Sequence, residues 1–281
     1  MISGSLVRST IEIGRQVSLA KGIAEEQQKI SLGTRLLRAS DDPAAAVKVE
    51  TLRKGIDGLS VIQRNIGQAS SMASLAESNL ATAQTILDQA MESIQAVVTG
   101  TASDSNRATA AQAIRQMAAD LRALSAAKGP TGEDLFPEGT PISIPLGPTS
   151  SPATIARAQA FTAEVNGQSL SIDAVLDQAA DALTDPSASP RDRAAFLDFV
   201  RDGSQRMAEG RSALGAIGLG LERLSAATAD REIWFKARLG EVMDTNIAES
   251  VSRITSGQVT LQAAQAVYAR LGQSSLFDLL R

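Results

Sequence analysis

The residue types that most often perform chemistry in proteins are scarce in this chain of 281 residues. It contains no His and no Cys, which excludes the commonest general base, the commonest transition-metal ligand and any disulfide or thiolate site. The adjacent carboxylates of Asp41 and Asp42 remain, because paired acids can bind a cation. Their place between Ser40 and Pro43 favours a simpler interpretation, a helix start in which Ser40 is the cap, the acids face the helix dipole and Pro43 sets the first turn. We therefore expect no catalytic residue, no metal site and no cofactor.

Composition indicates long helices rather than a compact aromatic core. Hydrophobic residues make up 43% of the chain but aromatic residues only 3%, and alanine fills much of the difference. The net charge is −4 and no basic block stands out, which argues against a nucleic-acid partner. No apolar run is long enough for a signal peptide or a membrane span. We expect no membrane insertion and no cleaved signal, although some export machines accept uncleaved termini.

The strongest pattern lies between Leu59 and Val97, where apolar residues recur at alternating steps of three and four. This heptad pattern predicts a long helix packed along a partner helix. Small and polar residues at 99–104 predict a break, after which a second helix folds back antiparallel on the first and ends near Lys128. The first pattern comprises Leu59, Ile62, Ile66, Ala69, Ala73, Ala76, Leu80, Ala83, Leu87, Ala90, Ile94 and Val97, and the second Ala110, Ile114, Met117, Leu121 and Leu124.

Residues 130–190 differ in kind, because eight of the nine prolines lie there and exclude a long helix. Short strands are predicted at 142–144, 161–165 and 170–172, and Asn166-Gly167 indicates a hairpin turn between the last two. A short helix is predicted at 173–183.

Helical heptads resume after Pro190 with a repeat of Val200, Met207, Leu214 and Leu221. Gly203 and Gly210 interrupt this stripe, and they either weaken it or mark close packing. Farther along, Trp234 and Phe235 could anchor a partner, but burial within the helical part of the chain is the favoured interpretation.

Both termini carry amphipathic patterns that would be marginally stable as isolated helices. Glycines interrupt the N-terminal stripe, and two glutamines occupy seam positions in the C-terminal one, which costs stability. Such helices can remain disordered in a monomer and become ordered when an assembly buries their apolar faces. The residues predicted to form the assembly interface are Leu6, Ile13, Val17, Ala20, Ala24, Ile247, Val251, Ile254, Leu261 and Tyr268.

The predicted fold is mainly α: a long antiparallel helical or coiled-coil rod built from the N- and C-terminal segments, with a small mixed α/β or loop-rich domain at the chain midpoint. The expected divisions are 1–45 (N-terminal assembly helix and turn), 46–129 (N-terminal part of the rod), 130–190 (variable middle domain), 191–240 (C-terminal part of the rod) and 241–281 (C-terminal assembly helix). From the pattern alone, an ordinary intracellular helical bundle stays open.

Several ordered matches at both termini resemble the bacterial flagellin superfamily. They are Ile30–Leu36 followed by Ser40–Ala46, the start of the long heptad helix at 58–80, the turn at 100–107 and the C-terminal end near Ser275-Leu276. The resemblance covers roughly residues 1–136 and 190–281 and leaves out the proline-rich middle. Within the superfamily, Ser-Asp-Asp-Pro at 40–43 and the ending at 275–280 are more similar to hook–filament junction proteins (hook-associated protein 3) than to flagellins, whereas the final Leu280-Arg281 is similar to flagellins.

This resemblance implies a structural protein rather than an enzyme, exported to the extracellular flagellum. It implies self-association through both terminal helices, contacts with neighbouring hook-associated and flagellin subunits, and an export chaperone as a further partner. The alternatives are a flagellin that builds the filament and a flagellin-like protein whose middle domain binds a glycan or surface. A cytoplasmic coiled-coil adaptor is a third possibility, and it predicts protease-resistant termini.

Overall fold

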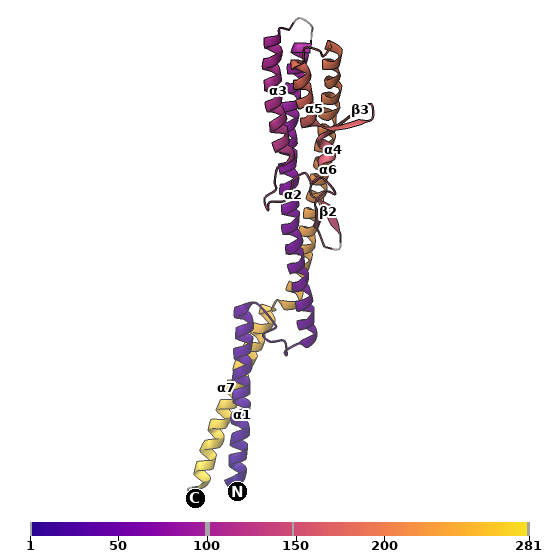
Figure 1. Ribbon diagram of the computed structural model, residues 1–281. Coiled ribbons are helices and arrows are strands. Elements are labelled where there is room, and N and C mark those ends of the chain that lie inside the picture. The colour runs from indigo at the N-terminus through magenta and orange to yellow at the C-terminus, as the bar shows by residue number, and fades with distance from the viewer. Residues whose placement is uncertain (1, 99–101, 148, 280–281) are drawn as a thin grey trace. The chain divides into compact units, whose positions relative to one another are not determined.

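The protein forms two compact units, and the chain passes between them twice. The computed structural model describes residues 2–98, 102–147 and 149–279, and the side chains of 10–98, 102–147 and 149–270. One unit, called the terminal unit below, comprises Met1–Asp57 with Glu232–Arg281; the other, the central unit, comprises Gly58–Arg231. Figure 1 shows the elements of each, and helices dominate both.

Two very long helices, α2 (Pro43–Val98) and α6 (Pro190–Met243), contribute to both units. The predicted heptad seam of α2 is confirmed, because every seam residue from Leu59 to Val97 is buried except Ile62, which is half-buried. α3 (Asp104–Ser125) packs into the same core through Ala111, Ile114, Ala118 and Leu121. Its N-cap is Ser103, whose hydroxyl accepts a hydrogen bond from the backbone N–H of Asn106. The rest of the predicted break, at 99–101, lies outside the described residues.

The heptad stripe of α6 is also buried, and its glycines mark close packing. Val200, Met207, Leu214 and Leu221 are at most 2% exposed. A Cβ at Gly203 would lie 2.9 Å from Cδ1 of Ile172. Such a distance is too short for an ordinary carbon–carbon contact, so the missing side chain is what allows the segment carrying Ile172 to approach α6.

The proline-rich segment is built from short elements, as predicted. β1 (Ser143–Pro145) pairs antiparallel with β2 (Ser150–Pro152), which the sequence pattern did not predict, and β3 (Thr162–Val165) pairs with β4 (Gln168–Ser171). The hairpin turn between β3 and β4 is confirmed, with φ of 53° at Asn166 and 79° at Gly167. Between the two pairs lies a single turn of helix, α4 (Arg157–Ala160), and after them α5 (Ile172–Thr184).

The described residues of this middle segment share their core with the long helices. Leu135, Phe136, Phe161 and Ile172 are buried in one hydrophobic cluster with the heptad residues of α2, α3 and α6. A second cluster joins Ile144, Leu146 and Ala153 to α2 and α6. α5 lies along α3 (Figure 1). Arg122 of α3 pairs with Asp173 and Asp177 of α5 at 2.9 and 2.7 Å. The segment is therefore held by packing against α2, α3 and α6.

The terminal unit is built around two further helices, α1 (Ile2–Leu32) and α7 (Ile247–Leu279). The start of α2 and the end of α6 complete it. Phe235 of α6 packs against the backbone of Gly55 of α2, where a Cβ would lie 2.7 Å from the ring. None of the described helices is long and apolar enough to cross a membrane.

Candidate assembly surface of the terminal helix pair

α1 and α7 lie side by side and antiparallel. Ile23 of α1 approaches Gly257 of α7, where a Cβ would lie 3.0 Å from Cγ1 of Ile23. Three residues later in α1, Glu26 faces Arg253, which comes earlier in α7, at 3.7 Å. Contacts that advance along one helix and recede along the other require opposite directions. Figure 1 accordingly shows the N-terminal end of α1 beside the C-terminal end of α7.

The inner faces of this pair, called the seam here, are only partly buried. Among the described side chains of α1 and α7, Ser250 alone is fully buried, at 5% exposed. The half-buried residues repeat at steps of three and four, as expected for one face of each helix. In α1 they include Glu12, Gln16, Leu19, Ile23, Glu26 and Ile30, and with Ser250 in α7 they are Ile254, Gly257, Leu261 and Ala264.

The seam is also polar for an interface between helices. Glu12, Gln16 and Glu26 occupy seam positions, and the Nε2 atom of Gln16 is buried without a hydrogen-bond partner. A buried donor without a partner costs roughly 1–3 kcal/mol. The α1–α7 pair therefore gains little stability from burial within one chain.

Larger apolar side chains lie beside the seam, in solvent. Ile13 and Val17 of α1 are 49% and 62% exposed, and Ile247 and Val251 of α7 are 60% and 49% exposed. Ala20 and Ala24 continue the α1 row and are also exposed. We call these six residues the exposed stripe: Ile13, Val17, Ala20, Ala24, Ile247 and Val251.

The two halves of the exposed stripe lie on the same side of the pair. In α1, each stripe residue follows a seam residue by one position, as Val17 follows Gln16. In α7, Val251 likewise follows Ser250. One position is a rotation of about 100° around a helix, in the same sense for both helices. Two antiparallel helices that face each other then carry both rows on one common side.

The predicted interface residues thus divide into two groups. Ile13, Val17, Ala20, Ala24, Ile247 and Val251 form the exposed stripe, whereas Ile254 and Leu261 are half-buried in the seam. Tyr268 occupies a seam position by spacing and is 38% exposed. The side chain of Leu6 lies outside the described residues.

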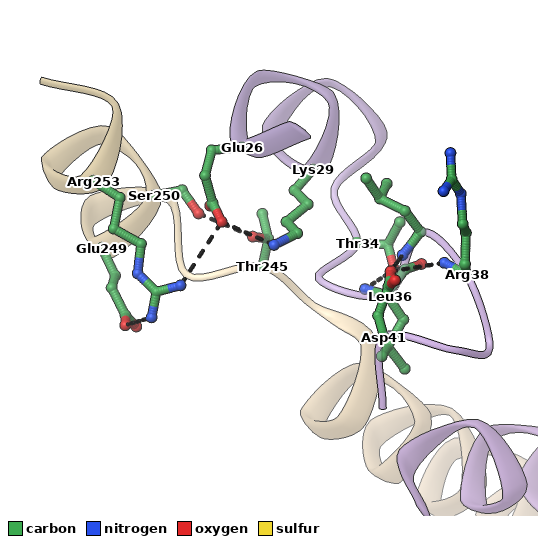
Figure 2. A network of polar contacts seen from close by, with 11 residues as sticks. Glu26, Lys29, Thr34, Leu36, Arg38, Asp41, Thr245, Glu249, Ser250 and Arg253 are labelled. Carbon is green, nitrogen blue, oxygen red and sulfur yellow. Dashed lines mark hydrogen bonds and ion pairs between the residues drawn. The ribbon is translucent and has the colours of Figure 1, made fainter. Parts of the chain in front are cut away.

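A polar network joins α1 to the start of α7, as Figure 2 shows. The carboxylate of Glu26 accepts a hydrogen bond from Lys29 Nζ at 2.8 Å and lies near Arg253, which also pairs with Glu249 at 2.6 Å. Ser250 also hydrogen-bonds the Glu26 carboxylate, and the Ser250 hydroxyl lies 3.3 Å from that of Thr245. The hydrogen bond from Lys29 does most to lower the pKa of Glu26; burial opposes it, and Ser250 and Arg253 add to the lowering.

The segment that joins α1 to α2, residues 33–42, is hydrogen-bonded to the chain where α6 ends and α7 is about to begin, at residues 243–245. The backbone N–H of Arg35 donates to the carbonyl of Met243 at 2.8 Å, and that of Thr245 donates to the carbonyl of Gly33 at 3.2 Å. Gly33 has φ of 68°, a conformation that suits glycine. The Arg35 side chain also reaches Asp42 at 3.6 Å. The two backbone bonds, together with the hydrogen bond from Arg35 Nε to the carbonyl of Val242 at 2.6 Å, connect segments that are more than 200 residues apart in the sequence.

The helix start at residues 40–43 exists, but its cap is not the predicted one. α2 begins at Pro43, and the side chain of Asp42 accepts the backbone N–H of Ala45 at 3.0 Å, so Asp42 is the N-cap. Asp41 instead accepts the backbone N–H groups of Leu37 and Arg38, which closes the preceding turn (Figure 2). The prediction of Ser40 as cap was wrong because proline occupies the first helical position and leaves the cap to the residue before it.

The prediction that Trp234 is buried was also wrong. Its side chain is 54% exposed and lies against the guanidinium of Arg238, 5.6 Å from the ring centroid. Phe235 takes the inner position instead, because adjacent residues of a helix point about 100° apart.

Sequence patterns gave no indication of the Glu26 network. Glu26 and Arg253 lie at opposite ends of the chain, and each also has an ordinary partner within its own helix, Lys29 and Glu249. Within the described ranges, no group of three or more Asp or Glu side chains could hold a metal ion.

Comparison with known proteins gives these features a context. Residues 15–138 match the family model of the bacterial flagellin N-terminal helical region. The matched range includes most of α1, the cap at Asp42 and the whole heptad seam of α2. A comparison with curated protein sequences finds no match.

Solved structures share the fold at low sequence identity. A Vibrio parahaemolyticus protein, provisionally assigned as a flagellar hook-associated protein, has 16% identity and a TM-score of 0.66 over 73% of this chain and 100% of its own. Hook-associated protein 3 from Legionella pneumophila has 13% identity and a TM-score of 0.62 over 69% and 98%. The flagellar junction protein FlgL from Legionella pneumophila has 13% identity and a TM-score of 0.55 over 70% and 99%. The helical fold of this chain is that of these proteins.

Proposed function

We propose that this protein is a structural subunit of the bacterial flagellum that forms the junction between hook and filament. The observation that carries the proposal is the exposed stripe on a pair of terminal helices in which Ser250 alone, among the described side chains, is fully buried. Its fold is shared with a flagellar junction protein and with hook-associated protein 3, and its N-terminal part matches a flagellin region.

The mechanism we propose is stabilisation of the terminal helices by neighbouring subunits. Isolated helices with a polar seam are weakly stable, and they gain most of their stability from packing. A neighbouring copy that covers Ile13, Val17, Ile247 and Val251 removes their apolar surface from water, at about 25 cal/mol per Å². The same helices remain loosely held before assembly, which suits export.

The proposal assigns roles to the segments expected from the sequence. Residues 1–45 and 241–281 serve as assembly segments, residues 46–129 and 191–240 as the helical rod, and residues 130–190 as a variable middle domain. The partners are further copies of this chain, hook-associated and flagellin subunits, and an export chaperone. The site of action is the extracellular flagellum. This role involves no catalysis.

Seeded assembly tests the proposal directly. Purified full-length protein is added to hook fragments, and the distal ends are examined by negative-stain electron microscopy, before and after flagellin is supplied. We expect a short collar that stops growing and then accepts flagellin. Long filaments grown from this protein alone would identify it as a flagellin. A folded protein that does not bind hook ends would contradict a flagellar role.

A pair of variants tests the surface itself. Val17→Asp places a charge in the exposed stripe, and Val61→Asp places the same charge on α2 in the central unit, where Val61 is 46% exposed. We expect Val17→Asp to fold normally and lose most of its incorporation into the collar, whereas Val61→Asp incorporates like the unmodified protein. Normal incorporation of Val17→Asp would contradict the assigned surface.

A further inference from the structure

The register of α1 against α7, meaning which residues of the two helices lie opposite each other, is set only in part by apolar packing. Seam residues recur every three or four positions in both helices, so a slip of one turn would bring different seam residues opposite each other. Ile23 now lies against Gly257, and the neighbouring seam positions of α7 are Ile254 and Leu261. Because a Cβ at position 257 would already lie 3.0 Å from Cγ1 of Ile23, placing Ile254 or Leu261 opposite Ile23 would require the helices to move apart, and Gly257 itself favours the observed register. A polar group in a seam can select one register, because its partners exist at only one position.

Glu26 is such a group. Its side chain is only 14% exposed, and its contacts on α7 are Ser250 and Arg253. One helical turn is about 5.4 Å, so a slip of one turn would break both contacts and place the carboxylate beside different side chains. Lys29 moves together with Glu26 on α1, so it neutralises the charge in every register and favours none.

The partners of Glu26 are tied to the start of α7. Asn246 accepts the backbone N–H of Glu249 through its side chain and the backbone N–H of Ser250 through its carbonyl, so it is the N-cap of α7. Ser250 is one turn inside this helix, and its hydroxyl lies beside that of Thr245, which precedes the cap. The backbone of Thr245 is in turn bonded to Gly33, just after α1. The α7 partners of Glu26 therefore lie at one defined place, the start of α7 (Figure 2).

We propose that Glu26 is a positioning residue that sets the register of α1 on α7. Its two contacts with α7, to Ser250 and Arg253, exist in one register only, and they add to the preference that Gly257 gives to the same register. The register decides which residues of α1 and α7 are neighbours in the exposed stripe. Only this last consequence rests on the proposed function; the pairing itself is a property of the single chain.

Cysteine crosslinking in the full-length protein tests the proposal, because the natural chain contains no Cys and introduced pairs have no competitors. Three double variants join Ile23→Cys to one seam position of α7: Ile254→Cys, Gly257→Cys or Leu261→Cys. Dilute protein is oxidised briefly, and intrachain crosslinks are separated from dimers by gel electrophoresis. We expect the Gly257 pair to dominate, because it lies in the observed register.

The deciding comparison adds Glu26→Gln to each pair. We expect the preference for the Gly257 pair over the other two to fall by about tenfold, the effect of losing roughly one charge-assisted hydrogen bond. Arg253→Gln, which leaves Glu26 intact, should lower the preference in the same direction. Glu25→Gln is the matched control, because the ion pair that the described side chains give Glu25 is with Lys21 of its own helix, at 4.0 Å.

Two results would overturn the proposal. An unchanged preference in Glu26→Gln would show that apolar packing sets the register. Equal loss of all three crosslinks would show that Glu26 only stabilises the pair in general. Both results are independent of whether the protein assembles on hooks.

Discussion

At the scale of single residues, two glycines of α6, Gly210 and Gly215, differ in what surrounds them. A Cβ at Gly210 would lie 2.9 Å from Cδ1 of Ile155 and 3.2 Å from both Cβ of Ala160 and Cδ1 of Leu80. At Gly215, on the same helix, nothing lies within 4 Å. The first glycine allows the middle segment to pack against α6, whereas the second only increases backbone freedom.

Replacing these glycines by alanine should therefore change stability in opposite directions. Gly210→Ala overpacks the core and is expected to lower the free energy of unfolding by about 1–3 kcal/mol. Gly215→Ala should raise it by about 0.5–1 kcal/mol, because alanine favours helix. Chemical denaturation followed by circular dichroism measures both. A stabilising effect of Gly210→Ala would contradict the close packing described here.

Glu26 should make the terminal pair sensitive to acid. Its folded-state pKa is lowered from the ordinary value of 4.5, so the stability it contributes is present above pH 4.5 and is lost as pH falls through the lower, folded value. Lys29 and Arg253 are the basic side chains that face Glu26, and Glu249, which pairs with Arg253, is the other acid close by. Because other carboxylates also titrate, the informative quantity is the difference from Glu26→Gln.

We expect protease resistance of α1 and α7 in the unmodified protein to exceed that of Glu26→Gln at neutral pH. The two proteins should converge at pH values well below 4.5, where Glu26 is protonated. Brief digestion measures this resistance, with pepsin at low pH and with a neutral protease at neutral pH. At each pH the unmodified protein is compared with Glu26→Gln. A difference that persists undiminished in acid would rule out the charge of Glu26 as its cause.

At the scale of elements, the start of α2 shows why a capping pattern can be recognised while its cap is misplaced. Ser40, Asp41 and Asp42 are all good capping residues, and local sequence ranks them almost equally. The choice depends on Pro43, whose fixed φ suits the first helical position. Asp41 then becomes free to close the turn before the helix through Leu37 and Arg38.

Asp42→Ala should consequently lower the free energy of unfolding by about 1 kcal/mol, the usual effect of removing a side-chain cap. Ser40→Ala, a matched change two residues earlier, should have little effect because Ser40 is exposed and does not cap the helix. Thermal or denaturant unfolding of the two variants provides the comparison. A larger loss of stability in Ser40→Ala than in Asp42→Ala would support Ser40 as the helix cap, as predicted from the sequence.

At the scale of the whole molecule, the two units differ in how much apolar surface a single chain can bury. The central unit contains both hydrophobic clusters, with Leu80, Leu87, Ile94 and Leu121 fully buried. Its middle segment contributes to the same core, so residues 130–190 depend on α2, α3 and α6 for their structure. A glycan-binding role for this segment is therefore best tested on the full-length protein.

This difference should be measurable as a difference in local stability. In the unassembled protein, backbone amides of α1 and α7 should exchange with solvent much faster than those of α2 between Leu59 and Val97, because local opening of the terminal pair exposes little additional apolar surface. Hydrogen–deuterium exchange followed by mass spectrometry measures this, and assembly on hook fragments should slow exchange in the termini. Equally strong protection of both regions before assembly would favour a stably folded adaptor.

The sequence by itself determined the long helices, the β3–β4 hairpin and the buried seam of α2, because heptad spacing and turn residues act between neighbours in the chain. It also indicated Ile13, Val17, Ile247 and Val251 as interface candidates. Only the tertiary structure decided which side of α1 faces α7, and it left those four residues in solvent while placing Ile254 and Leu261 in the seam. It likewise paired Glu26 with Arg253 and merged the middle segment with the core of the long helices. The physical reason is that these contacts join residues far apart in the chain, and their energies depend on which surfaces meet rather than on any local pattern.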